Sequence, residues 1–293
     1  MVVFKPKYTI TDSLSTSMRK VGELMGELNS RAFSGTALLN MAREARALSS
    51  FSSTSIEGNP LPLTDVKKLL KSNPVNIRDT EREVLNYNKA LLNLDRKFEL
   101  NEDIRISNDF ICEIQSIVID GLIQKSYIGK YREQPVFVND PRKRETVYLP
   151  PDHKDVNSLM TELVEFINSN EGVIDPLIIA GIFHKQSVVI HPFMDGNGRT
   201  TRLVTKTLLA KLGMNTLKLF SFENYYNNNV TKYFEKVGVL GNYYDIFKGL
   251  DFTAWLEYFV EGIIDELIRV KSMLPEYQER LEPHHKVIIE YIK

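Results

Sequence analysis

The stretch HPFMDGNGRTTR at residues 191–202 concentrates residue types that can do chemistry. A chain with only five histidines places one of them beside a carboxylate, two glycines, an asparagine and two arginines within twelve residues. Packing in a helix or a core strand does not require that combination of residue types. Three explanations compete at this point: a metal site, a phosphate site, and a turn without a chemical role.

Pro192 and the threonine pair at 200–201 set the local structure of this stretch. Pro192 cannot donate a backbone hydrogen bond and disfavours helix at the residue before it, so a helix over 175–190 should end at His191. The threonines can cap a following helix. Residues 192–199 are therefore predicted to form a loop that leads into a helix N-terminus.

The glycines and arginines of the loop favour a phosphate site. Gly196 and Gly198 allow backbone amides to come close to a ligand, and a helix N-terminus attracts anions. Arg199 and Arg202 would add guanidinium groups, which match phosphate oxygens. This combination predicts a cradle for a phosphate group.

Asp195 would repel a phosphate unless a cation lies between them. Mg²⁺ is commonly held by one or two carboxylates together with substrate phosphates, so we expect Asp195 to bind Mg²⁺. His191, with a pKa expected in the useful range, could take a proton from an attacking hydroxyl. A zinc site is disfavoured because His184 and His191 have no third soft ligand nearby, and we expect His184 to be a hydrogen-bonded helix residue.

HPFMDGNGRTTR resembles the signature of Fic-domain proteins, His-Pro-Phe-x-(Asp/Glu)-Gly-Asn-Gly-Arg-x-x-Arg, and matches every defined position. The resemblance implies a protein adenylyltransferase, which moves AMP from ATP to a Ser, Thr or Tyr hydroxyl of a protein with Mg²⁺ bound. It assigns His191 as the base, Asp195 as the Mg²⁺ ligand, Asn197 with the Gly196 and Gly198 amides as the anion hole, Arg199 as a phosphate contact, Arg202 as the γ-phosphate contact and Phe193 as a core anchor.

A second unusual segment is SSTSIEGNPL at residues 52–61. Glu57 lies where a helix should end, and a carboxylate is unfavourable at that end of the helix dipole. Either Glu57 is a solvated helix-end residue, or it has a cationic partner elsewhere in the chain.

This segment resembles the inhibitory motif of Fic proteins, (Ser/Thr)-x-x-x-Glu-(Gly/Asn), through Ser53, Glu57 and Gly58. The resemblance implies that Glu57 pairs with Arg202 and so excludes the γ-phosphate of ATP. Because the motif at 53–58 precedes the signature in the same chain, it implies the subgroup that is inhibited by its own N-terminal helix.

Helical periodicity dominates the rest of the chain, and one β-hairpin is expected over 127–150, where PVFV and TVYL flank a polar turn. By the resemblance, this hairpin is the flap that holds the target. We therefore predict a mainly α-helical Fic fold with one β-hairpin flap and an N-terminal helical region. The predicted helices, with Thr64 and Thr80 as N-caps of two of them, cover 14–28, 36–51, 63–70, 80–94, 107–123, 155–168, 175–190, 200–212, 226–238 and 251–271.

The predicted organisation has three parts. Residues 1–100 form the N-terminal helical region, 101–270 the catalytic core, and 271–293 a C-terminal helical segment. The segment HHKVIIEYIK at the end could be the first helix of a winged-helix module, in which case DNA becomes a partner. A homodimer is possible through exposed helical faces.

Composition excludes several function classes. The 37 basic and 38 acidic residues nearly cancel, so no overall charge favours nucleic acid or membrane partners. The single cysteine, Cys112, falls in an apolar helical pattern and is predicted to be a buried structural thiol. No apolar run reaches the roughly 20 residues that span a bilayer, and no signal peptide is evident, so a cytoplasmic location without membrane contact is predicted.

Three functions remain open from the sequence. The first is a self-inhibited adenylyltransferase that acts on a protein of unknown identity, which could be itself. The second is the same fold transferring another phosphate-bearing group or removing AMP. The third is a nucleotide-sensing, DNA-binding regulator. The adenine site is not located; NYYNNNVTKYF at 224–234 is a candidate, but ordinary capping and packing explain this segment equally well.

Overall fold

Helices α7 (Pro176–Ile190) and α8 (Asn197–Lys211) form the centre of the fold, and the predicted phosphate loop joins them. The computed structural model describes residues 4–30, 35–72, 74–140, 145–211 and 219–279. Helix α7 is buried along almost its whole length, as expected for a helix that is apolar on all sides.

Helix α8 is also buried, although its sequence NGRTTRLVTKTLLAK is polar. Buried arginine, lysine and threonine side chains need hydrogen-bond or ionic partners, and the surrounding helices have to supply them. A polar helix at the centre of a helical protein is therefore a sign of a binding site rather than of packing alone.

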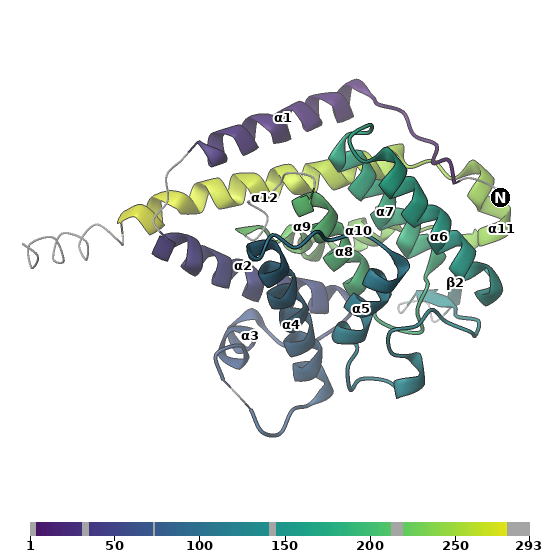
Figure 1. The fold of residues 1–293 in the computed structure, drawn as a ribbon, viewed down its shortest axis with the longest axis horizontal. Coiled ribbons are helices and arrows are strands. Elements are labelled where there is room, and N and C mark those ends of the chain that lie inside the picture. Colours follow the sequence, from purple (N-terminus) through teal and green to yellow (C-terminus); the bar gives the residue numbers. More distant parts are fainter. Residues whose placement is uncertain (1–3, 31–34, 73, 141–144, 212–218, 280–293) are drawn as a thin grey trace, which may run out of the picture.

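The N-terminal and C-terminal helices enclose this centre (Figure 1). Helix α1 (Asp12–Asn29) packs along α12 (Thr253–Glu279), and α2 (Gly35–Ile56) packs against α4 (Asp79–Glu99) and α9 (Phe222–Asn228). One hydrophobic cluster extends from residue 14 to residue 270, so the N-terminal helices share their core with the rest of the protein. The other helices are α3 (Leu63–Leu69), α5 (Asn108–Val118), α6 (His153–Asn170), α10 (Val230–Val237) and α11 (Tyr243–Ile246), with short 3-10 turns at Lys125–Tyr127 and Phe247–Gly249.

The predicted hairpin is present, and a third strand pairs with it. Strands β1 (Val138–Asp140) and β2 (Glu145–Leu149) pair antiparallel, and the two-residue strand β3 (Gly241–Asn242) pairs parallel to β2. So short a strand leaves no alternating pattern in the sequence, and it was not predicted. The mainly helical fold with one hairpin is confirmed. The predicted polar turn includes residues 141–144, which lie outside the described residues.

Several predicted helix ends were wrong. Helix α8 begins at Asn197 rather than at Thr200, because the Thr200 amide already donates to the Gly196 carbonyl, 2.9 Å away. The Thr201 hydroxyl is bonded to Ser187 of α7 at 3.0 Å and is not a cap.

The predicted N-caps and two helix spans also differ from the structure. The N-caps of α3 and α4 are Pro62 and Arg78, where we expected Thr64 and Thr80. The helix predicted over 226–238 is two helices, because the Asn229 side chain accepts from the Lys232 amide and starts α10 anew. Among the described residues, no helix combines the length and apolarity needed to cross a bilayer.

Candidate active site

His191 ends helix α7 in a strained backbone conformation. Its φ is 52°, in the left-handed region that residues other than glycine rarely adopt, and its amide still donates to the Ser187 carbonyl at 3.0 Å. Pro192 disfavours a further helical residue, as predicted, so the chain turns sharply at this residue. The turn separates His191 from the helix axis and places it at the start of the loop.

Arg132 holds this turn in place, and the sequence did not indicate it. Its buried guanidinium donates from Nε to the His191 carbonyl at 2.8 Å and from Nη2 to the Pro151 carbonyl at 2.6 Å. Its backbone amide donates to the Pro192 carbonyl at 2.8 Å. Arg132 therefore ties the segments on both sides of the hairpin to the backbone of the loop.

The imidazole of His191 is neutral at physiological pH. Burial, followed by the nearby positive charge of Arg132, lowers its pKa to about 4, although a hydrogen bond to the Val188 carbonyl acts in the opposite direction. This pKa lies below the range that we expected from the sequence for a residue that takes a proton from a hydroxyl. A neutral ring that donates one N–H to Val188 keeps a lone pair on its other nitrogen, which a proton acceptor requires.

The side chain of Asn197 bonds to the backbone of the loop and does not line the anion site. The Asn197 amide group accepts from the Phe193 amide at 2.8 Å and donates to the Phe193 carbonyl at 2.9 Å. Phe193 is buried in the core, as expected. Because the Asn197 side chain is fully engaged, its contribution to an anion site would come from its backbone N–H in the first turn of α8, which has no intrahelical acceptor.

The arginines predicted to bind phosphate are both buried. The side chain of Arg202 is 0% exposed and that of Arg199 is 4% exposed. Nε of Arg199 has no hydrogen-bond partner among the described residues, and Nη1 forms no hydrogen bond, although Oε1 of Glu83 lies 3.3 Å from it. Buried guanidinium N–H groups without acceptors are costly, so an anionic ligand at this position would relieve that cost.

Glu57 pairs with Arg202, the cationic partner that the resemblance implied. Glu57 Oε1 lies 2.6 Å from Arg202 Nη2. Ser53, one helical turn earlier, receives two further bonds: its hydroxyl accepts from Arg202 Nε at 2.8 Å and its carbonyl from Nη2 at 2.9 Å. Helix α2 ends at Ile56, and Gly58, with a φ of 93°, turns the chain directly after Glu57.

The Glu57 carboxylate occupies the N-terminal end of helix α8. A Cβ atom placed on Gly198 would lie 2.2 Å from Glu57 Oε1, so the carboxylate rests against the glycine where a side chain would be. Burial acts to raise the pKa of Glu57, but Arg202 and Arg199 outweigh it and hold that pKa below its usual value. Glu57 is thus an anion of the chain itself, bound where a helix N-terminus and two arginines favour an anion.

Asp195 is the one carboxylate of the loop 192–199, and its side chain is 48% exposed. Its Oδ1 accepts from the Gly196 amide at 2.5 Å and from Arg199 Nη2 at 3.0 Å. Within the described ranges, no cluster of three or more His, Cys, Asp or Glu residues could form a metal site alone. One accessible carboxylate beside a phosphate cradle suits Mg²⁺, which takes its other ligands from water and substrate.

Residues predicted to be structural have packing partners. His184 is bonded through its ring nitrogens to Tyr233 at 3.0 Å and to Thr205 at 3.1 Å. Tyr226, from the candidate adenine segment, is buried and packs edge-on against His184, which supports the packing interpretation of 224–234. Cys112 was predicted to be buried, but it is only half-buried because it packs at the edge of the core cluster. Its partial burial raises the pKa of the thiol to about 11.

Comparisons with known sequences place this site in a family. Residues 105–209 match the Fic/DOC family, a range that includes the hairpin, α7 and the signature loop. The protein adenylyltransferase fic-1 of Caenorhabditis elegans is 32% identical over 201 residues, which cover 67% of this chain and 38% of the relative. The protein adenylyltransferase Fic of Drosophila melanogaster is 29% identical over 184 residues, 61% of this chain and 35% of the relative. The matched regions are thus little more than a third of each of these relatives.

Solved structures share the fold at lower identity. A Fic family protein from Desulfovibrio desulfuricans G20 superposes with a TM-score of 0.75 at 22% identity, covering 92% of this chain and 77% of that one. Fic-1 of C. elegans superposes with a TM-score of 0.69 at 24% identity, covering 90% and 73%. The likeness therefore extends beyond residues 105–209 to the N-terminal and C-terminal helices.

Proposed function

Because residues 105–209 form a domain of the Fic/DOC family, we propose that this protein is an adenylyltransferase that moves AMP from ATP to a hydroxyl of a protein. The relatives from C. elegans and D. melanogaster carry the same activity in their names. The observation that carries the proposal is the cradle at the start of α8, where Gly198 and the two buried arginines surround a carboxylate.

His191 is the proposed base. Its neutral imidazole accepts the proton of the acceptor hydroxyl while that oxygen attacks the α-phosphorus and pyrophosphate leaves. The hydrogen bond to the Val188 carbonyl fixes the His191 ring. The bond from Arg132 to the His191 carbonyl fixes the backbone that carries the ring. The strained backbone at His191 is consistent with a residue held in one position for chemistry.

The phosphate chain is proposed to lie against the first turn of α8. The free amides of that turn, Arg199 and Arg202 offset the negative charge of the phosphates. Asp195 would hold Mg²⁺, which supplies further charge neutralisation to the phosphate oxygens. Arg132 precedes the hairpin and bonds to the Pro151 carbonyl after it, which holds the hairpin beside this loop. We propose that the hairpin aligns the acceptor segment.

Glu57 is the proposed inhibitor of this site. It occupies the guanidinium of Arg202 that the γ-phosphate needs, and its charge repels that phosphate. ATP can then bind productively only when Glu57 moves away. Ser53 bonds to Arg202, Glu57 supplies the competing carboxylate, and Gly58 makes the turn that directs this carboxylate at the site.

Mass spectrometry of the reaction product tests the proposal. The Glu57→Gly protein, incubated with ATP and Mg²⁺, should gain the mass of AMP on a Ser, Thr or Tyr, either in itself or in an added protein. The Glu57→Gly, His191→Ala double variant should gain nothing while still binding ATP. A different added mass would identify transfer of another phosphate-bearing group. Loss of AMP from a modified protein would instead identify hydrolytic removal of AMP.

We also propose the other features that the sequence predicts. They are the boundaries at 1–100, 101–270 and 271–293, a homodimer, a cytoplasmic location and a DNA-binding module after the core. Most of 271–293 lies outside the described residues. Size-exclusion chromatography with light scattering would test the dimer directly.

A further inference from the structure

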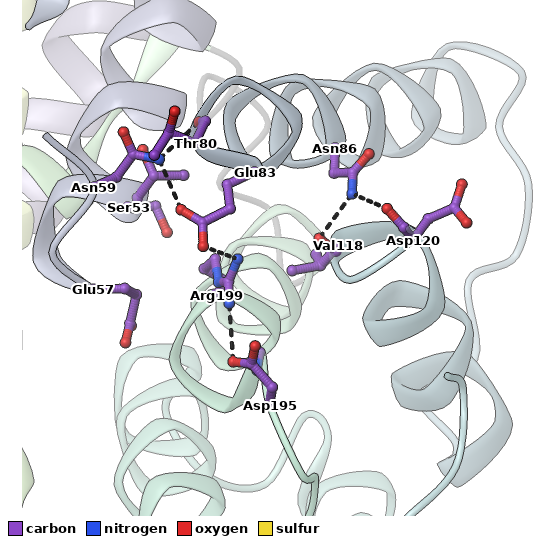
Figure 2. A network of polar contacts seen from close by, with 12 residues as sticks. Ser53, Glu57, Asn59, Thr80, Glu83, Asn86, Val118, Asp120, Asp195 and Arg199 are labelled. Carbon is purple, nitrogen blue, oxygen red and sulfur yellow. Dashed lines mark hydrogen bonds and ion pairs between the residues drawn. The ribbon is translucent and has the colours of Figure 1, made fainter. Parts of the chain in front are cut away.

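Arg199 lies between two carboxylates that come from opposite sides of the site (Figure 2). Nη2 of Arg199 is 3.0 Å from Oδ1 of Asp195 in the loop, and Nη1 is 3.3 Å from Oε1 of Glu83 on helix α4. The proposed function uses Asp195 and Arg199. It does not use Glu83, a residue that nothing in the loop or the inhibitory motif points to.

Glu83 is itself held by the residue two positions after Glu57. Nδ2 of Asn59 donates to Glu83 Oε2 at 2.7 Å and to the Thr80 carbonyl at 2.8 Å. Oδ1 of Asn59 accepts from the Leu61 amide at 3.1 Å, so all polar atoms of this buried side chain are engaged. Glu83 therefore has one oxygen fixed by Asn59 and the other directed at Arg199.

We propose that Glu83 is a positioning residue that keeps Arg199 from closing onto Asp195, and that Asn59 holds Glu83 for this role. This rests on the proposed function. A buried guanidinium with a single carboxylate beside it frequently forms a bidentate pair, which here would use both oxygens of Asp195. Glu83 attracts the other side of the same guanidinium. One oxygen of Asp195 is then left for a divalent cation, and Arg199 is held in reach of phosphate.

The turn after helix α2 consequently has two opposite effects on the site. Glu57 occupies Arg202 and excludes phosphate, whereas Asn59 acts through Glu83 to support Arg199. Removing the Glu57 side chain should release the site, but displacing the whole turn should also loosen Arg199. Productive release of Glu57 therefore requires a small local change that leaves Asn59 in place.

The test compares variants in the released Glu57→Gly background by calorimetry and by labelling. In that background, Mg²⁺ should tighten ATP binding, and Glu83→Gln or Asn59→Ala should remove most of this gain, because Arg199 then competes for Asp195. The same variants should lower kcat by about tenfold or more, as expected when a group is misplaced by a fraction of an ångström, and should raise KM for ATP by no more than the lost Mg²⁺ gain. Glu99→Gln is the matched control: it makes the same change on the same helix at an exposed position and should leave both measurements unchanged.

Three results separate the outcomes. If Glu83→Gln keeps both the Mg²⁺ gain and kcat within about twofold of its Glu57→Gly parent, Glu83 does not position Arg199. If Glu83→Gln or Asn59→Ala speeds labelling in the otherwise unchanged chain, Glu83 is a second inhibitory carboxylate, and the proposal is wrong. If the Glu57→Gly parent neither binds ATP nor labels any protein, the proposed function itself fails, and the positioning role fails with it.

Discussion

Oε1 of Glu57 is 2.6 Å from Nη2 of Arg202, and a Cβ on Gly198 would collide with the same oxygen. The carboxylate thus fills the space above the first turn of α8 and also neutralises the arginine beneath it. An anion that comes from outside has to displace Glu57 to reach that arginine. Inhibition in this protein is, on our account, the binding of an internal anion to an anion site.

The first prediction concerns the fit between Glu57 and Gly198. Gly198→Ala should destabilise the unaltered protein by about 1–3 kcal/mol, because the new methyl group overlaps the Glu57 carboxylate. In the Glu57→Gly background the overlap with Glu57 is gone and only a 2.9 Å approach of the methyl group to Arg202 Nη1 remains, so the same substitution should cost less. Urea unfolding of the four proteins gives the coupling free energy of the cycle. Equal costs of Gly198→Ala in both backgrounds would show that the two residues do not compete for space.

The second prediction concerns the stability of the ion pair. Glu57→Gly leaves Arg202, which is 0% exposed, with Ser53 but without a carboxylate, and should lower stability by about 1–3 kcal/mol. ATP with Mg²⁺ at 100 times its dissociation constant should restore about 2.7 kcal/mol. Thermal unfolding should therefore show a lower Tm that ATP raises strongly, and the unaltered protein should respond weakly.

The matched control for this prediction is Glu99→Gly, the same change at the exposed end of helix α4. It should respond to ATP as weakly as the unaltered protein does. An equal shift of Tm by ATP in the unaltered and Glu57→Gly proteins would mean that Glu57 does not exclude the nucleotide.

The third prediction concerns the protonation of His191. Its pKa is lowered to about 4, so the ring stays neutral from pH 8 down to about pH 5. In the unfolded chain the same residue takes up a proton near pH 6.5. Its contribution to the free energy of unfolding is therefore fully present above pH 6.5 and declines between about pH 6.5 and 4. NMR titration of the ring protons, assigned with His191→Gln, checks this directly, and a midpoint near 6.5 in the folded protein would refute it.

Features built from residues that are close together in the chain could be predicted from the sequence, whereas contacts between residues far apart in the chain could not. The loop at 191–202 could be identified because a phosphate cradle is built from neighbours in the chain, so its residue types and spacing are readable together. The same holds for the long periodic helices. Phe193 was correctly placed in the core, although that expectation came from the family resemblance rather than from the loop itself.

Long-range contacts could not be read in this way. Arg132 stands in KYREQ and Glu83 in EREVLNY, where a charged residue is ordinarily a solvated position on a loop or helix. Only the fold brings Arg132 to the end of α7 and Glu83 to Arg199. The lowered pKa of His191 was missed for a related reason, because burial is a property of the packed molecule. Glu57 was an exception, since its pairing with Arg202 was indicated by the family resemblance.

The rate of AMP transfer before and after loss of the Glu57 side chain tests the central claim most directly. Initial rates should be measured with labelled ATP and Mg²⁺ for the unaltered protein, Glu57→Gly and the Glu99→Gly control. A hydrogen bond to a charged group is worth about 1.5–3 kcal/mol, so Glu57→Gly should be faster by about tenfold or more, with the control unchanged. Equal rates for the unaltered and Glu57→Gly proteins would contradict the account of Glu57 as the anion that closes the site.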